Sequence, residues 1–322
     1  MAESRKSIFQ RYYTNEPFVD RYLNEPEAAV DVIIPVIHSN ELWDANLRSL
    51  YREIPINRLL LADGGCTDDT IETASKYPRV VVLDHRNFAS LGYSERKLIE
   101  AVETEWFIHT HSDVFLPDGW FDIMRKYQGE YDWYGCIERG TIQVEYDRDF
   151  GERPWAGAQF GRKSVFELGL KQVEDDYIYR QSDFLYRLML EGGGFKEGYI
   201  RETYHYHQTM HRPSPWFRKI TSVDVKIEMT PEEEKRTWLM ELRGTIKYLE
   251  PTIPWAVSEV YHSMLHLIEL KQLNWKDLQR WVEDTNPVWL PYVTRGYIIK
   301  KLMISFLKRI YRAFTRLENN EK

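Results

Sequence analysis

The chain of 322 residues has little cysteine and no long apolar run. Its only cysteines are Cys66 and Cys136, so neither a disulfide framework nor a cysteine-based zinc site is expected, and a reducing cytoplasm is the predicted setting. No run of about 18 apolar residues occurs, which argues against a membrane-spanning helix. The amino-terminal region also lacks the pattern of a signal peptide. We therefore expect a soluble chain, or one that rests on a single face of a membrane.

Two common phosphate-binding motifs are absent as well. There is no G-x-G-x-x-G and no G-x-x-x-x-G-K-[ST], so the dinucleotide fingerprint and the P-loop are both excluded. The formal net charge of -7 argues against nucleic acid as a general partner. Hydrophobic residues make up 43% of the chain, which is enough to build the core of a globular protein.

What the chain does have is a regular alternation of apolar runs and amphipathic segments. Strands are predicted at 30–36, 58–63, 79–84 and 105–114, with helices between them at 40–53, 68–77 and 93–103. Such alternation indicates βαβ units, a parallel sheet and the α/β class. The pattern becomes mixed beyond Gly119, and it is helical from about Pro215. We expect a lead-in at 1–29, a catalytic domain at 30–214 and a helical region at 215–322.

The stretch "EWFIHTHSDVFLPDGW" (Glu105 to Trp120) places His109, His111 and Asp113 at alternate positions. If it is a strand, side chains two residues apart share a face, and three potential metal ligands would stand in a row. That spacing is similar to the motif of metallo-β-lactamase-like hydrolases. Such a site needs a histidine where Val114 stands, and a metal-dependent hydrolase is therefore the least favoured reading.

The turn "ADGGCTDDT" (Ala62 to Thr70) follows the second predicted strand. Ligands of open α/β sheets bind outside the carboxyl ends of the strands. There the Asp63 carboxylate could accept hydrogen bonds from a ribose or a base edge. The alternative is that Asp63 only caps a tight turn.

Four motifs in this order, "VDVIIPV", "LLLADGGCTDDT", "HRNFASLGYSERKLIEA" and "EWFIHTHSDVFLPDGW", resemble those of family 2 glycosyltransferases. The resemblance covers about residues 30 to 210. It implies the GT-A fold, a Rossmann-like and mostly parallel sheet flanked by helices, and a nucleotide-diphosphosugar as donor. The residues that it assigns to binding the nucleotide-sugar are Pro35, Val36, Asp63, Arg86, Asn87 and Arg96.

The same resemblance implies a metal cofactor, Mn²⁺ or Mg²⁺. Asp113 takes the place of the last aspartate of the D-x-D motif, which coordinates the ion. His111 replaces the first aspartate, and we expect it to contact the nucleotide-sugar. In "ETYHYHQTMHR", His205 or His207 is the expected late ligand, in preference to His211.

Inverting transfer to a hydroxyl also needs a carboxylate as general base. The segment "YRQSDFLYRLMLEGGGF" resembles the family's base-carrying segment, with Asp183 as the leading candidate. Arg180 and Gln181 occupy the places of the acidic pair, so Asp175 and Asp176 from "VEDDY" remain alternatives. Trp155 is the predicted acceptor-side residue, because its ring could stack on a sugar.

The carboxyl-terminal segment has a different charge balance. Between Arg295 and Arg316 every charged residue is basic, and apolar residues recur at helical spacing: Ile299, Leu302, Met303, Phe306, Ile310, Phe314 and Leu317. A basic amphipathic helix is typical of interfacial membrane anchors. The alternative is a terminal helix that packs on the protein and leaves its basic face in water.

Taken together, these features predict an inverting glycosyltransferase of the hexosyltransferase type. Its substrates would be a nucleotide-diphosphosugar and a hydroxyl acceptor, either a glycan or a lipid-linked molecule. The predicted location is cytoplasmic, with the 295–317 segment at the inner face of the membrane. The alternative from another class is a non-catalytic GT-A-like protein that binds carbohydrate or serves as a scaffold.

Overall fold

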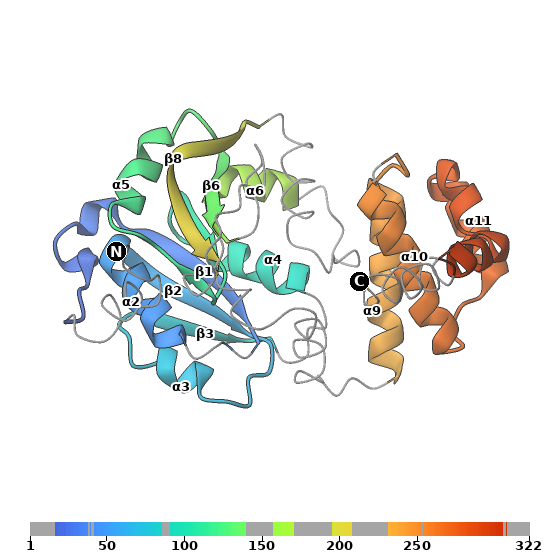
Figure 1. Ribbon diagram of the computed structural model, residues 1–322, viewed down its shortest axis with the longest axis horizontal. Coiled ribbons are helices and arrows are strands. Elements are labelled where there is room, and N and C mark those ends of the chain that lie inside the picture. Colours follow the sequence, from blue (N-terminus) through green and yellow to red (C-terminus); the bar gives the residue numbers. More distant parts are fainter. Residues whose placement is uncertain are drawn as a thin grey trace, which may run out of the picture. The chain divides into compact units, whose positions relative to one another are not determined.

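The structure is a computed structural model in which the described residues fall into two compact units (Figure 1). The first unit holds the described residues up to 207, and the second holds those from 231 onward. The described residues are 17–37, 39, 42–85, 91–139, 157–170, 195–207, 231–252, 254–304 and 307.

An eight-stranded sheet forms the centre of the first unit, in the order β3-β2-β1-β4-β7-β6-β8-β5. The strands β3, β2, β1 and β4 run parallel to one another, as do β6 and β8. Antiparallel pairing joins β4 to β7, β7 to β6, and β8 to β5. The strands are β1 (Val30–Val36), β2 (Ile56–Asp63), β3 (Val80–Asp84), β4 (Trp106–Thr110), β5 (Val114–Phe115), β6 (Trp133–Arg139), β7 (Ala158–Arg162) and β8 (Glu197–His207).

Helices flank this sheet and connect its parallel strands, as Figure 1 shows. Among them, α4 packs on β1 and β2, while α2 packs on β5. The predicted class, an α/β chain with a mostly parallel central sheet flanked by helices, is therefore confirmed. The helical elements of this unit are η1 (Arg21–Leu23), η2 (Pro26–Ala28), α2 (Trp43–Glu53), α3 (Thr70–Ala74), α4 (Leu91–Ala101), α5 (Trp120–Met124), η3 (Arg125–Tyr127) and α6 (Lys163–Leu170).

The core follows from the apolar runs of the central strands. Every residue of β1 except Pro35 is buried, as expected of a β-branched run that has protein on both faces. Aromatic side chains fill the space further along the sheet. The rings of Tyr134 and Phe160 stack with centroids 5.4 Å apart, and Trp120 lies 5.8 Å from Phe160. Aromatic residues make up 14% of the chain, and part of this content therefore serves packing.

The parallel pairing brings the carboxyl ends of the central strands to one edge of the sheet. Val36 pairs with Asp63, and Asp63 pairs with Asp84. Strand β4 pairs with β1 in the same direction and ends at Thr110. The residues that follow β1, β2 and β4 consequently meet at this edge, where α/β sheets bind their ligands.

The fourth strand is shorter than the 105–114 predicted from the sequence. It ends at Thr110, and a turn closed by a hydrogen bond from the Val114 amide to the His111 carbonyl (3.3 Å) separates it from β5. His111 and Asp113 therefore belong to a turn and do not continue the strand face of His109. The His111 amide still bonds to the Gly157 carbonyl (2.9 Å), one residue before β7, and the chain then turns away toward β5.

The second unit is helical in its described part, as the sequence predicted. Helix α9 begins at Pro231, a residue type that suits the first position of a helix, and it packs against α10. The Trp289 indole is buried and donates to the Leu249 carbonyl (2.7 Å). The elements are α9 (Pro231–Tyr248), α10 (Pro254–Glu269), α11 (Trp275–Thr285) and η5 (Pro287–Tyr292), followed by a helical stretch at 295–304.

Candidate functional site

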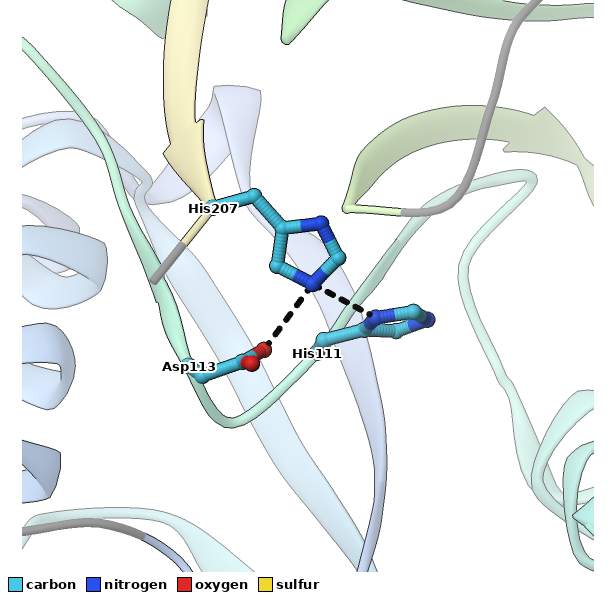
Figure 2. Close-up of side chains that lie close together, drawn as sticks. All are labelled: His111, Asp113 and His207. Carbon is cyan, nitrogen blue, oxygen red and sulfur yellow. Dashed lines mark hydrogen bonds and ion pairs between the residues drawn. The ribbon is translucent and has the colours of Figure 1, made fainter. Parts of the chain in front are cut away.

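Three side chains that could bind a metal ion converge where β4 ends. They are His111, Asp113 and His207, and one potential ligand atom from each lies within 4.8 Å of the other two. The His207 Nε2 atom is 3.2 Å from Asp113 Oδ1 and 3.3 Å from His111 Nδ1. Figure 2 shows the three side chains pointing toward one another, two from the turn and one from the end of β8. We call these residues the His-Asp-His cluster.

Backbone pairing brings the cluster together. Val114 pairs with His207 across β5 and β8, so the turn that carries Asp113 lies beside the end of β8. From α2, the buried Asn46 side chain donates through Nδ2 to the Ser112 carbonyl (2.9 Å), between the two turn ligands. This bond holds the turn against a helix, because a buried amide that lost its partner would destabilise the fold.

His207 lies between two carboxylates. Its Nε2 atom faces Asp113, and its Nδ1 atom is 3.0 Å from Glu138 Oε1, at the end of β6. Burial alone would lower the pKa of His207, but the two negative charges outweigh it and raise this pKa to about 10. The two carboxylates therefore favour the protonated ring, whose nitrogens face Asp113 and Glu138.

The two turn residues respond to this cation in opposite ways. Burial and the neighbouring His207 charge lower the pKa of His111 to about 3, so its ring is neutral and can offer a lone pair. Burial would raise the pKa of Asp113, but His207 and His111 hold it below its ordinary value. The cluster thus offers an ionised carboxylate and a neutral imidazole at ordinary pH, the forms in which these groups bind metals.

The two remaining histidines of this region have other partners. In the buried ring of His109, Nε2 lies 3.2 Å from Glu95 Oε1 and Nδ1 lies 3.2 Å from Gln159 Oε1, so both nitrogens have partners outside the cluster, although the ring touches His111 edge-on. His205 contacts the Cys136 thiol through Nδ1 (3.4 Å). Of the two histidines predicted in β8 as alternative late ligands, it is His207 that the fold brings to His111 and Asp113.

The predicted nucleotide-binding residues that the structure describes lie on β1, β2 and α4. Pro35 and Val36 end β1, and Val36 pairs with Asp63 at the end of β2. The Asp63 Oδ1 atom accepts hydrogen bonds from the amides of Gly65 (2.9 Å) and Cys66 (2.7 Å). Asp63 therefore caps the turn that follows β2, as one of its two expected roles requires.

Arg96 is also described and lies in α4. It is buried and pairs with Glu100 one helical turn later (3.1 Å). Six further residues with predicted roles lie outside the described part of the chain. They are the acids Asp175, Asp176 and Asp183, the pair Arg86 and Asn87, and Trp155.

Sequence reasoning missed Glu138 and Asn46. Glu138 lies in the region beyond Gly119 where the sequence pattern is mixed, so no pattern indicated that it would lie beside a histidine. Asn46 reads as one more polar residue in an amphipathic helix, although its side chain is fully buried. A polar residue on the apolar face of a helix was the available signal, since buried amides need partners.

The residues present fit a divalent metal ion. Two imidazole nitrogens and one carboxylate oxygen from separate side chains converge in Figure 2 with no backbone between them. Imidazole and carboxylate are both common ligands of divalent transition metals. Three protein ligands also leave positions on such an ion for the oxygens of a substrate or water.

No protein-family model matches the chain, and no curated protein matches it. Among solved structures, S. aureus TarS 1-349 in complex with UDP-GlcNAc is 14% identical, with 78% of each chain covered and a TM-score of 0.45. The mannosyltransferase PcManGT from Pyrobaculum calidifontis, in complex with GDP-Man and Mn²⁺, is 11% identical. That match covers 96% of this chain and 95% of the other, with a TM-score of 0.45.

No helix among the described residues is long and apolar enough to cross a membrane.

Proposed function

We propose that this protein is an inverting glycosyltransferase of the family 2 type, which moves a sugar from a nucleotide-diphosphosugar to a hydroxyl acceptor. The observation that carries the proposal is the His-Asp-His cluster at the carboxyl edge of the parallel sheet. The sequence resemblance places a diphosphate-binding metal at Asp113, and the fold brings two more potential ligands to that residue. Two independent lines thus meet at one position.

The cluster supports Mn²⁺ in preference to Mg²⁺. Mg²⁺ prefers oxygen ligands in a regular octahedron, and two imidazoles are a poor match for it. His111, Asp113 and His207 would hold the ion. When bound, such an ion neutralises the negative charge that builds on a leaving diphosphate.

The remaining chemistry belongs to the protein side chains. The acceptor hydroxyl attacks the anomeric carbon, the bond from that carbon to the diphosphate oxygen breaks, and the nucleoside diphosphate leaves. A carboxylate takes the hydroxyl proton, and we assign this role to Asp183, with Asp175 and Asp176 as alternatives. On the donor side, Asp63 and the ends of β1 and β2 form one edge at which a nucleoside can bind. Arg86, Asn87 and Arg96 are assigned to the donor as well, and Trp155 to the acceptor sugar.

The basic carboxyl-terminal helix supports an acceptor at a membrane surface. In the described stretch 295–304 and at 307, five apolar side chains are more than one-third exposed: Ile299, Leu302, Met303, Ile304 and Leu307. Lys300 and Lys301 are exposed among them. Apolar side chains beside lysines suit an anionic bilayer surface, where the apolar groups enter the interface and the lysines meet the headgroups. We therefore propose a lipid-linked or polysaccharide acceptor and a peripheral location at the inner face of the membrane.

Thermal-shift measurements with UDP, GDP and dTDP, each with and without Mn²⁺, test the proposal. A ligand present at 100 times its Kd stabilises the folded state by about 2.7 kcal/mol. We expect one nucleotide to raise the Tm, and to raise it further when Mn²⁺ is present. A flat response to all three nucleotides would refute the glycosyltransferase and favour the non-catalytic carbohydrate-binding alternative.

A further inference from the structure

Glu138 is a second carboxylate beside the His-Asp-His cluster. It lies near the end of β6, its side chain is 13% exposed, and its Oε1 atom is 3.0 Å from His207 Nδ1. The other nitrogen of the same ring, Nε2, faces Asp113 at 3.2 Å and His111 at 3.3 Å. The His207 ring therefore stands between Glu138 on one side and the two turn ligands on the other.

The sheet builds this contact through an irregular register. Strands β6 and β8 pair in parallel as Cys136 with Ile200, but the next pair is Ile137 with Tyr204. Three residues of β8 have no partner at this shift, and beyond it Glu138 pairs with His205. If the earlier offset continued, Glu138 would pair with Glu202, three residues before His205. The contact with His207 thus depends on this one irregularity.

A histidine binds a metal through one ring nitrogen, and the partner of the other nitrogen decides which one is free. A carboxylate that accepts from Nδ1–H holds the ring in the tautomer with its lone pair on Nε2. It also fixes the ring plane and makes the ligand nitrogen more basic. In this chain the nitrogen that would be left free, Nε2, is the one that points at His111 and Asp113 (Figure 2).

We propose that Glu138 is a positioning residue for His207, and that its carboxylate orients the ring so that Nε2 serves as a ligand of the divalent metal ion. This inference rests on the metal site of the proposed function. Glu138 does not bind the ion or the substrate, and it acts only through His207. It is a role that the sequence resemblance does not assign to any residue.

Metal affinity tests the proposal without the need for substrate. Free Mn²⁺ is counted by its EPR signal during titration of the full-length wild type and of Glu138→Ala and Glu138→Gln. Loss of such an outer partner lowers metal affinity by roughly 10- to 100-fold, which is the expected result for Glu138→Ala. Glu138→Gln keeps an amide oxygen that accepts from Nδ1–H, so its affinity should lie between those of the wild type and Glu138→Ala.

Asp132→Asn is the matched control. Asp132 is 17% exposed, stands one residue before β6 and pairs with Arg162 (3.3 Å), so its loss removes a carboxylate of similar burial from the same region. We expect its Mn²⁺ affinity to equal that of the wild type. If Glu138 had only a structural role, Glu138→Ala and Glu138→Gln would lower the Tm, but their Mn²⁺ affinities would equal that of the wild type.

The outcomes separate the two proposals. If the wild type binds Mn²⁺ and both Glu138 variants bind it equally well, Glu138 has no positioning role, although the metal site stands. Equal losses in Glu138→Ala and Asp132→Asn would also overturn the inference, because they would indicate general destabilisation. If the wild type binds no Mn²⁺, the metal site and this inference fail together. Should Glu138→Ala not fold, Glu138→Gln decides, since it has nearly the same shape.

Discussion

Gly157 is a position at which a single added methyl group should disturb the site. It precedes β7 with φ +138°, a conformation that side chains other than glycine rarely adopt. A Cβ atom here would lie 2.0 Å from His205 Nε2 and within 3 Å of two more ring atoms. The ring has no room to retreat, because it is buried with Nδ1 against the Cys136 thiol, which in turn accepts from the Trp120 indole (3.3 Å).

The cost of Gly157→Ala is the sum of two effects. A residue held in a sparsely populated backbone conformation costs about 1–3 kcal/mol. Insertion of a methyl group into a packed interior adds about 1–3 kcal/mol. We therefore expect the free energy of unfolding to fall by about 2–6 kcal/mol. Gly119→Ala is a reference without a clash, because Gly119 has a positive φ (+77°) in the left-handed region and nothing lies within 4 Å of its added Cβ.

Urea unfolding of the full-length chain, followed by far-UV circular dichroism, gives these differences. In a His205→Ala background the clash is gone, so Gly157→Ala should cost only its backbone strain, about 1–3 kcal/mol. The double-mutant cycle should therefore show a coupling of roughly 1–3 kcal/mol between the two positions. Additive effects, or equal costs for Gly157→Ala and Gly119→Ala, would refute the packing argument. Because the Gly157 carbonyl holds the His111 amide, the Mn²⁺ affinity of Gly157→Ala should fall as well.

Asp113→Ala removes the only carboxylate of the His-Asp-His cluster, so we expect a folded protein whose Tm no longer responds to Mn²⁺ with nucleotide; an unchanged response would exclude Asp113 as a ligand. Asp31 is fully buried and 2.6 Å from Arg58; near neutral pH, Asp31→Asn should destabilise the fold by about 3–5 kcal/mol. Burial alone would raise the pKa of Asp31, but Arg58 and other donors lower it overall. The stabilisation from the ionised Asp31 is therefore fully present above the pKa of this group in the unfolded chain, and it is lost as pH falls through its pKa in the folded chain. Calorimetry should show the Tm values of wild type and variant converging in acid. A Tm difference that stays constant with pH would contradict this. Replacing both Lys300 and Lys301 by Gln should weaken sedimentation with anionic vesicles about 30-fold, from about 1 kcal/mol per lysine, without affecting neutral vesicles; unchanged binding would exclude the anchor.

Much of the fold could be read from local patterns. The apolar run of β1 was predicted with the bounds that the structure has, and the alternation with helices indicated the parallel sheet. Such features depend on side-chain period and burial, which are written into neighbouring residues. The convergence of Asp63 with the end of β1 follows from parallel pairing alone. The order of the motifs also singled out Asp113 and a late histidine as candidate ligands before the structure placed them side by side.

Only the tertiary structure distinguished His207 from His205. Both have the same chemistry and stand two residues apart, so local sequence does not separate them. The pairing of Val114 with His207 and the irregular register of β6 and β8 made the choice. Glu138 was invisible as a partner for the same reason, since its contact joins residues 69 positions apart. The sequence by itself determined the alternation of strands and helices and the types of side chain available at the site. Which ring nitrogen meets which carboxylate was decided by long-range strand register, which no local pattern encodes.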